Sequence, residues 1–109
     1  MIKGIGVDIA QVSRFKDKNE HFIKRVLSLK ELDIYNSLNE ERRITFLASR
    51  FSAKEALFKA YKKLDYEFSL ISVLNKENGG PYIEMDSPDV IHISISHDGD
   101  YVVTYVIVE

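Results

Sequence analysis

The spacing of apolar residues predicts a strand at the start of the chain. Apolar residues alternate with small or polar ones over residues 2–9, as in a half-buried strand. Because side chains point to opposite faces of a strand in turn, this segment has two distinct faces. One face carries Ile5, Val7 and Ile9, and the other carries Gly4, Gly6 and Asp8.

Short helices are predicted over residues 12–38, with breaks near Asn19 and Ser28. Ser28 is a suitable first cap, and Glu31 stands three residues later, which is the spacing of a capping box. We therefore expect a helix to begin directly after Ser28.

The clearest element is a long helix from about Asn39 to Leu64. Asn39 can cap its start, and Lys62 and Lys63 would stand in its last turn. Apolar residues form two stripes on opposite sides, so we expect burial on two faces. The first stripe contains Ile44, Leu47, Ala48, Phe51 and Phe58, and the second contains Phe46, Ala53, Leu57, Ala60 and Leu64.

The second half of the chain predicts strands separated by turns. The strands are expected over residues 68–75, 82–85, 91–96 and 101–108, the last of them largely buried. Turn signals stand at Asn78-Gly79-Gly80-Pro81 and at Asp98-Gly99. Together these elements predict an α+β fold, a single domain over residues 1–109, in which the long helix packs on an antiparallel sheet.

Composition narrows the functional classes. The 109 residues include no cysteine, which excludes disulfides, thiolate metal sites and a cysteine nucleophile. No apolar run approaches the ~20 residues of a membrane span, and the first residues do not resemble a signal peptide. The net charge of −2 disfavours a general nucleic-acid binder. We expect a cytoplasmic protein that binds neither nucleic acid nor membranes.

The charge is unevenly distributed along the chain. Residues 1–25 carry a net +3, whereas no lysine or arginine follows Lys76. A basic segment on an acidic protein suggests an acidic partner. From charge alone, however, an ordinary solvated helix face is the favoured interpretation.

Two carboxylates are candidates for chemistry. Asp8 ends an apolar strand whose glycines leave room for a ligand or another backbone, although it could equally cap the following helix. Glu55 falls inside the first apolar stripe of the long helix, where a carboxylate needs a cationic partner or a metal. Lys59, one turn later, is the simplest partner. If both acids act together, their chemistry suits Mg²⁺.

Ser94, Ser96 and His97 stand at a strand end beside a turn, where hydroxyls and an imidazole can meet a phosphate. A Ser/His hydrolase is a weak alternative, because Ser96 and His97 are neighbours on a strand and point apart. A histidine exposed in a turn is the default interpretation.

Three segments together resemble the holo-acyl-carrier-protein synthases, the small class of 4′-phosphopantetheinyl transferases. They are Gly4-Ile5-Gly6-Val7-Asp8-Ile9 with Arg14-Phe15, then Arg50-Phe51-Ser52-Ala53-Lys54-Glu55-Ala56-Leu57-Phe58-Lys59-Ala60, and Ile93-Ser94-Ile95-Ser96-His97. Their order and spacing extend the resemblance over nearly the whole chain. The family's fold, with a long central helix on an antiparallel sheet, agrees with the pattern above.

The resemblance implies Mg²⁺-dependent transfer of 4′-phosphopantetheine from coenzyme A to a serine of an apo acyl carrier protein. Asp8 and Glu55 would hold the metal, and Lys59 would complete the catalytic set near the phosphates. The general base stays open between Glu55, a metal-bound water and a histidine. Residues expected to bind coenzyme A are Arg50, Lys54, Ser96 and His97.

The family also implies a homotrimer with active sites between subunits, and a small acidic carrier as partner. Residues expected to dock that carrier are Arg14, Lys18, Lys24 and Arg25. Two features depart from the family pattern: residues 61–66 contain no glycine, and an acid follows His97. The alternatives are a non-catalytic module that binds coenzyme A or a nucleotide, and an interaction subunit whose long helix is an oligomer seam.

Overall fold

The computed structural model describes residues 1–62 and 65–109, and its elements follow the predicted order. In chain order they are strand β1 (Gly4–Gln11), the 3-10 turn η1 (Val12–Phe15), helices α1 (Glu20–Val26), α2 (Leu29–Ser37) and α3 (Glu40–Ala60), the 3-10 turn η2 (Phe68–Leu70), and strands β2 (Ser72–Asn75), β3 (Pro81–Glu84), β4 (Ile91–Asp98) and β5 (Tyr101–Val108). The start of the expected strand over residues 68–75 is therefore a 3-10 turn.

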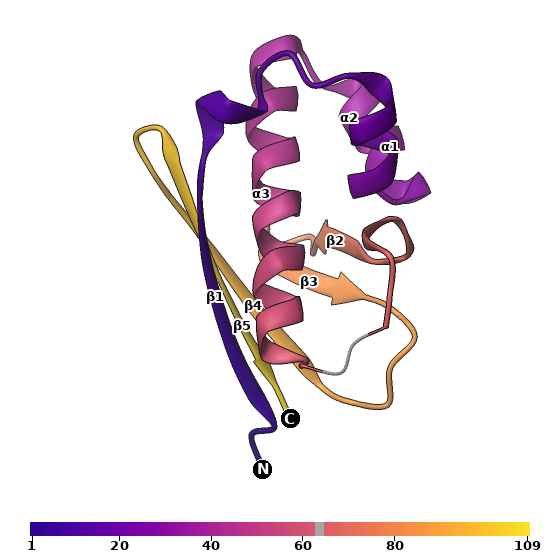
Figure 1. The fold of residues 1–109 in the computed structure, drawn as a ribbon, viewed down its shortest axis with the longest axis vertical. Helices are drawn as coiled ribbons and strands as arrows, with labels where there is room; N and C mark the ends of the chain where they lie inside the picture. The colour runs from indigo at the N-terminus through magenta and orange to yellow at the C-terminus, as the bar shows by residue number, and fades with distance from the viewer. Residues whose placement is uncertain (63–64) are drawn as a thin grey trace.

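Helix α3 lies in the middle of three layers (Figure 1). On one side is an antiparallel sheet with strand order β1-β5-β4, and on the other are α1, α2 and the β2–β3 hairpin. This confirms the predicted α+β fold with a long helix on an antiparallel sheet. The arrangement also explains why both sides of α3 are buried, as its two apolar stripes predict.

Side-chain caps begin the helices where the sequence indicates. The side chains of Asn19, Ser28 and Asn39 accept hydrogen bonds from backbone N–H groups of α1, α2 and α3, and Ser28 with Glu31 forms a complete capping box. Helix α3 ends earlier than predicted, at Ala60, so Lys62 is outside it. Lys63 and Leu64 lie outside the described residues.

A tertiary contact accompanies the early end of α3. The backbone of Tyr61 leaves the helical region at φ −115° and ψ 73°. Its hydroxyl contacts Ser87 Oγ at 3.1 Å and donates to Asp89, so it ties the chain after α3 to the loop between β3 and β4. The helical pattern of the sequence does not reveal this contact.

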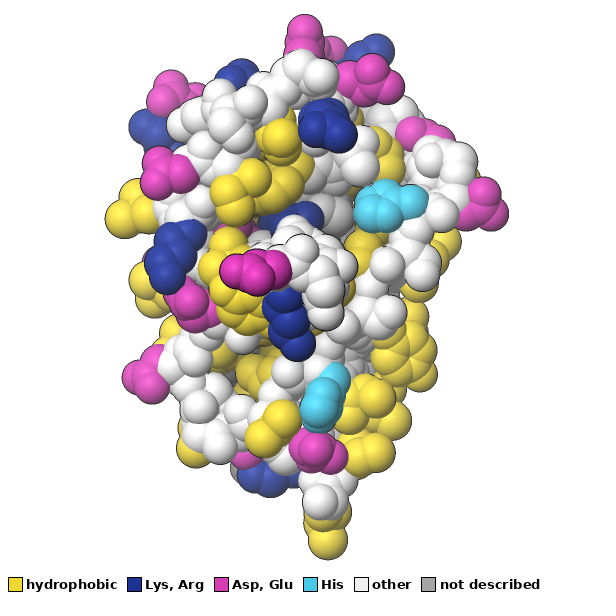
Figure 2. Space-filling view, turned by 180° about the vertical axis from the view of Figure 1, so that it is seen from behind, with side chains coloured by type: hydrophobic (Ala, Val, Ile, Leu, Met, Phe, Trp, Pro, Cys, Tyr) yellow, Lys and Arg dark blue, Asp and Glu magenta, His cyan; other side chains and the backbone are white. Residues whose placement is uncertain are grey.

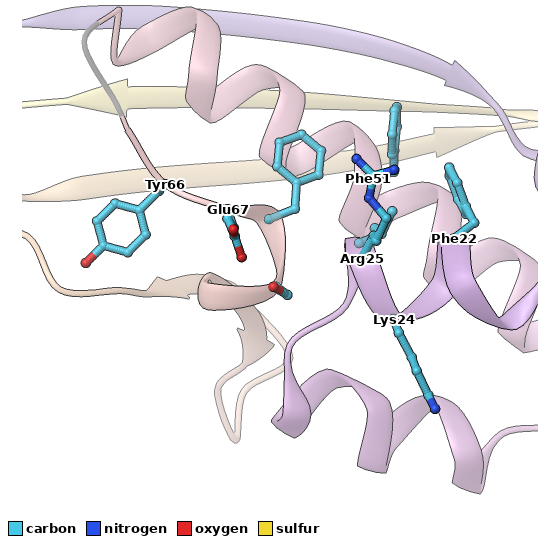
Figure 3. Close-up of a pocket in the computed structure, with 9 residues that line it drawn as sticks. Phe22, Lys24, Arg25, Phe51, Tyr66 and Glu67 are labelled. Carbon is cyan, nitrogen blue, oxygen red and sulfur yellow. The ribbon is translucent and has the colours of Figure 1, made fainter.

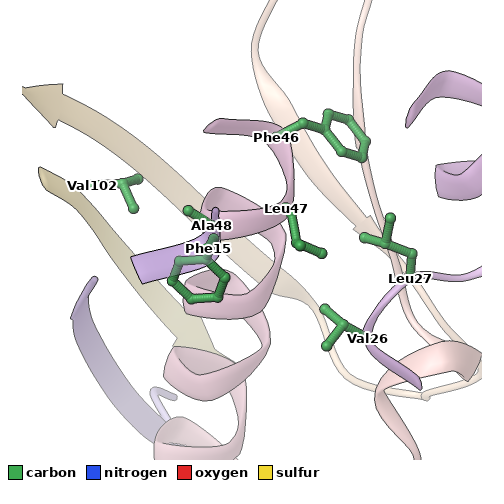
Figure 4. Close-up of a cluster of buried hydrophobic side chains, with 7 residues drawn as sticks. All are labelled: Phe15, Val26, Leu27, Phe46, Leu47, Ala48 and Val102. Carbon is green, nitrogen blue, oxygen red and sulfur yellow. The ribbon is translucent and has the colours of Figure 1, made fainter. Parts of the chain in front are cut away.

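Two apolar clusters form the core on either side of the middle of α3. The first is shown in Figure 4 and contains Phe15, Val26, Leu27, Phe46, Leu47, Ala48 and Val102. The second contains Ala56, Leu57, Ala60, Ile71, Val106 and Val108. Both clusters join α3 to β5, which is the central strand of the sheet.

Strand β1 approaches α3 closely because two of its residues are glycines. A Cβ atom at Gly6 would lie 1.9 Å from the carbonyl oxygen of Ala56, and one at Gly4 would lie 1.8 Å from that of Ala60. The glycine face of the strand therefore meets another backbone, which was one of the two expected reasons for it. Asp8, two residues further along the same face, is brought to the next turn of the helix.

The opposite face of the sheet is exposed and apolar. On β1, Ile5, Val7 and Ile9 are 53%, 48% and 64% exposed. On β5 the exposed residues are Tyr101, Val103 and Tyr105, while Val102, Thr104, Val106 and Val108 are buried. The expectation of a largely buried last strand is therefore wrong for every second residue, because α3 covers only one face of the sheet. Hydrophobic side chains reach the surface along this side of the molecule (Figure 2).

Within residues 1–62 and 65–109, no helix is long and apolar enough to cross a membrane.

Candidate functional site

Asp8 is held between the sheet and α3 by two side chains of the helix. Its Oδ2 accepts a hydrogen bond from Ser52 Oγ at 2.8 Å, and its Oδ1 lies 3.1 Å from Lys59 Nζ. The Asp8 side chain is 15% exposed, so it remains accessible at the edge of the two layers. Turn η1 begins after Gln11 and has no side-chain cap, so Asp8 does not cap the following helix.

Glu55 stands on the same side of α3, between the two residues that contact Asp8. It follows Ser52 by three positions and precedes Lys59 by four, and residues at these spacings are neighbours on a helix surface. Lys59 donates to Asp8 and to the carbonyl of Val7, at 3.1 Å each, rather than to Glu55. The simplest alternative, a Glu55–Lys59 pair, is therefore not formed.

The donor set at this edge fits a hard divalent cation that keeps open positions. Among the described residues, no group of three or more His, Cys, Asp or Glu side chains could hold a metal. Mg²⁺ usually takes one or two carboxylates and fills its other positions with water and phosphate oxygens. Asp8 and Glu55, with Lys59 beside them, have the charges and the oxygen ligands that such a site requires.

A buried contact fixes the turn of α3 that faces Asp8. The hydroxyl of Thr104, on β5, donates to the carbonyl of Ser52 at 2.9 Å, and both residues are fully buried. The sequence pattern assigns no role to Ser52 or Thr104. The only signal in the sequence is a pair of hydroxyl residues within otherwise apolar surroundings.

Arg50 and His97 line one cavity of about 440 Å³ near the start of α3. The guanidinium of Arg50 donates to Val73 O at 3.1 Å, Ser49 Oγ at 3.0 Å and Asn75 Oδ1 at 2.8 Å, and it lies 4.1 Å from the centre of the Phe46 ring. Burial lowers the pKa of Arg50, and nearby Glu31 opposes that shift. An arginine has five N–H donors, so three of them fix the group and two are left for a ligand.

The structure separates Ser96 from His97. Ser96 pairs in register with exposed Val103, and His97 with buried Val102, so the two side chains point to opposite faces of the sheet. This confirms that they do not form a nucleophile–base pair. Ser94 shares the outer face with Ser96.

The acid next to the His97 turn has a partner of its own. Asp100 accepts hydrogen bonds from the Ser13 backbone N–H at 3.0 Å and from Ser13 Oγ at 2.5 Å. These bonds lower the pKa of the Asp100 carboxyl. Its charge is therefore engaged by η1, whereas Asp98, the acid that directly follows His97, is exposed.

Lys54 is fully buried and does not line the cavity of Arg50 and His97, contrary to its expected contact with coenzyme A. Its side chain is 0% exposed and its ammonium lies 2.5 Å from Glu31 Oε1. It also donates to the carbonyls of Val26 at 2.6 Å and Phe68 at 2.9 Å. An ammonium has three N–H donors, and all three are used inside the protein.

The four basic residues expected at a docking surface are exposed but lie on different elements. Arg14 is in η1, Lys18 is in the following loop, and Lys24 and Arg25 are in the last turn of α1. Lys18 lies 4.9 Å from the centre of the Phe22 ring, and Lys24 pairs with Glu20 at 2.9 Å.

The last two of these bases, Lys24 and Arg25, border a cavity of about 570 Å³. Its walls also contain Phe22, Phe51, Tyr66, Glu67 and Phe68. In Figure 3, Arg25 points towards Phe51 whereas Lys24 points away from the cavity. An aromatic pocket with bases at its rim therefore separates α1 from η2.

Comparison with known proteins gives consistent matches. The 4′-phosphopantetheinyl transferase superfamily matches residues 4–106. A holo-[acyl-carrier-protein] synthase of Geobacillus sp. (strain WCH70) is 41% identical over 116 residues, covering 100% of this chain and 98% of that protein. The enzyme of the same name from Bacillus subtilis (strain 168) is 38% identical, with 100% and 97% covered.

Solved structures agree with the fold. The crystal structure of a holo-(acyl-carrier-protein) synthase from Bacillus anthracis str. Ames, in complex with CoA (3′,5′-ADP), superimposes with a TM-score of 0.92 at 33% identity, covering 99% of this chain and 96% of that one. The synthase from Neisseria meningitidis gives a TM-score of 0.88 at 28% identity, with 100% and 99% covered.

Proposed function

Because the chain belongs to the 4′-phosphopantetheinyl transferase superfamily and acts as a holo-[acyl-carrier-protein] synthase, we propose the following reaction and assign its residues. A serine Oγ of an apo acyl carrier protein attacks the phosphorus that carries the pantetheine arm of coenzyme A. The bond from that phosphorus to the bridging pyrophosphate oxygen breaks, and adenosine 3′,5′-bisphosphate leaves. The observation that carries this proposal is the meeting of Asp8, Ser52 and Lys59 across β1 and α3, with Glu55 on the same helix face.

We assign Asp8 and Glu55 as the residues that hold Mg²⁺. When bound, the ion supplies neutralisation of pyrophosphate charge and orientation for in-line attack. Ser52 keeps one oxygen of Asp8 directed by a hydrogen bond. Lys59, whose side chain is 53% exposed, places a positive charge beside Asp8 where the phosphates would lie.

The cavity that contains Arg50 and His97 is proposed as the site for the phosphorylated adenosine end of coenzyme A. Two N–H groups of Arg50 and the imidazole of His97 can contact a phosphate there. Ser96 faces the opposite side of the sheet. Its proposed contact with coenzyme A therefore requires the neighbouring subunit's site.

A homotrimer would cover the exposed apolar face of the sheet, defined by Ile5, Val7, Ile9, Tyr101, Val103 and Tyr105. A contiguous apolar patch of this kind is typical of a protein interface. We expect Val103→Asp to place a charge in that interface and convert trimers to monomers. Sedimentation velocity would measure this. A wild-type chain that sediments as a monomer at micromolar concentration would contradict the trimer.

The reaction is tested by the intact mass of an apo acyl carrier protein after incubation with this protein, coenzyme A and Mg²⁺. We expect a gain of one phosphopantetheine, and no gain in a parallel sample with a chelator. A non-catalytic binding module is the second candidate. It would bind coenzyme A but leave the mass of several different carriers unchanged.

Docking of the acidic carrier is assigned to Arg14, Lys18, Lys24 and Arg25. We expect Arg14→Glu with Arg25→Glu to raise the apparent KM for the carrier about tenfold or more and to weaken its salt dependence. The KM for coenzyme A should stay the same. Both constants come from initial rates at several salt concentrations.

A matched control reverses two bases elsewhere, with Lys30→Glu and Lys76→Glu. It changes the net charge equally but should leave the KM for the carrier nearly unchanged. An unaltered KM in the Arg14/Arg25 variant would remove these residues from the docking surface.

A further inference from the structure

We propose that the buried Lys54–Glu31 pair is a positioning unit that fixes the basic helix α1 against α3, and thereby sets the affinity for the carrier protein. The inference rests on the proposed function. It assigns to Lys54 a role that differs from the coenzyme A contact implied by the family resemblance. Neither residue touches substrate, so both act through the elements that they join.

Lys54 links three elements through one ammonium group. From α3 it donates to the carbonyl of Val26, the last residue of α1, at 2.6 Å, and to the carbonyl of Phe68, the first residue of η2, at 2.9 Å. Val26 and Phe68 both line the 570 Å³ aromatic cavity. The ammonium therefore holds two walls of that cavity at a fixed separation.

Glu31 extends the unit to α2 and β2. Its Oε1 accepts from Lys54 and from the Ser28 backbone N–H at 2.9 Å, and its Oε2 accepts from the Val73 backbone N–H at 2.8 Å. The side chain is fully buried. Burial lowers the pKa of Lys54 while Glu31 opposes this shift, and the geometry satisfies each charge with several hydrogen bonds.

Val73, on β2, connects the Lys54–Glu31 pair to the proposed coenzyme A cavity. Val73 gives its N–H to Glu31 and receives a bond at its carbonyl from Arg50 Nε at 3.1 Å. Arg50 and Lys54 are one helical turn apart, so α3 is linked to β2 directly through Arg50 and indirectly through Lys54 and Glu31. Arg50 has a second anchor at Asn75, however, and keeps its place without Lys54.

The position of α1 depends more strongly on Lys54. Helix α1 has only seven residues, and a helix this short is not stable by itself. Its last residues carry two proposed docking bases, Lys24 and Arg25, next to the carbonyl that Lys54 binds. Loss of the unit should therefore disturb carrier docking more than coenzyme A binding.

The test is the double variant Glu31→Gln with Lys54→Met. It removes both charges together, because a lone buried charge would be strongly destabilising whereas a neutral pair of similar volume is often tolerated. Circular dichroism and a thermal melt establish that it is folded. We expect the KM for the carrier to rise about tenfold, with kcat and the KM for coenzyme A changed less than about twofold.

Hydrogen–deuterium exchange provides a readout that does not depend on activity. Peptides covering residues 20–27 and 66–71 should exchange faster in the double variant, and peptides from β1 and β5 should not change. If the wild-type protein fails to modify any carrier but these exchange rates still rise, the proposed function fails and the positioning unit stands.

Lys54→Arg is a second variant that keeps the charge pair. A planar guanidinium cannot direct its donors to the same three acceptors as the compact ammonium. We therefore expect the carrier KM to rise, but by less than in the double variant. The matched control is Lys30→Met with Glu84→Gln, which removes an exposed ion pair and should leave all constants unchanged. A raised KM for coenzyme A alone, or unchanged constants and exchange in the folded variants, would overturn the inference.

Discussion

Glu55→Gln should reduce the rate of phosphopantetheine transfer by about a thousandfold or more, with the fold intact. The substitution keeps the size of the side chain and removes the charge that we assign to metal binding. Metal stabilisation of transferred charge is worth several kcal/mol, and each ~1.4 kcal/mol corresponds to a tenfold rate. The measurement is an intact-mass time course on the carrier protein at saturating coenzyme A and Mg²⁺.

Thermal stability of the same variant separates this role from a structural one. Glu55 is half-buried, and its side chain has no hydrogen bond or ion pair to the other described residues. We therefore expect the melting temperature without metal to stay nearly unchanged or to rise. Glu77→Gln, in the exposed β2–β3 turn, is a control that should retain full activity. A fully active Glu55→Gln protein would contradict the assignment of Glu55 to metal binding.

Gly6→Ala should destabilise the fold by about 3 kcal/mol or more, which is the upper part of the range for overpacking in a core. The added Cβ would lie 1.9 Å from the backbone oxygen of Ala56, and a backbone atom cannot move aside as a side chain can. For a chain of this size the melting temperature should fall by about 10–20 °C. A thermal melt followed by circular dichroism measures the change.

Gly80→Ala is the matched glycine control. There the nearest atom to an added Cβ is the side-chain oxygen of Asn78 at 3.2 Å, which can shift by a small amount. We expect a change of only a few degrees. If Gly6→Ala melts within a few degrees of the wild-type protein, β1 does not pack on α3 as described.

The sequence predicts most of the elements because their signals are local. Asn19, Ser28 and Asn39 cap the three helices as their residue types indicate. The glycine face of the first strand and the two apolar stripes of the long helix also have their predicted environments. Each of these features depends on residues that are close together in the chain.

The sequence pattern does not predict several contacts around the candidate site, because they join residues that are far apart in the chain. Glu31 has the pattern of a capping box, and nothing near it indicates that the same carboxylate also pairs with Lys54, 23 positions away. Lys54 itself follows a family motif, which favoured a ligand contact. The cavity shared by Arg50 and His97 forms only when β4 packs beside the start of α3. The packing of the elements, rather than the local sequence pattern, determines the Lys54–Glu31 pair and the Arg50–His97 cavity.

The order of strands in the sheet has a consequence for how the chain folds. The first strand, β1, and the fourth, β4, do not pair with each other, but both pair with β5, the last strand in chain order. Gly4 pairs with Val108, so these contacts close almost the full length of the chain. Long-range pairings of this kind slow folding. During synthesis, β1 therefore stays unpaired until Tyr101–Val108 has been made. Removal of that segment would leave both β1 and β4 without their pairing partner in this sheet.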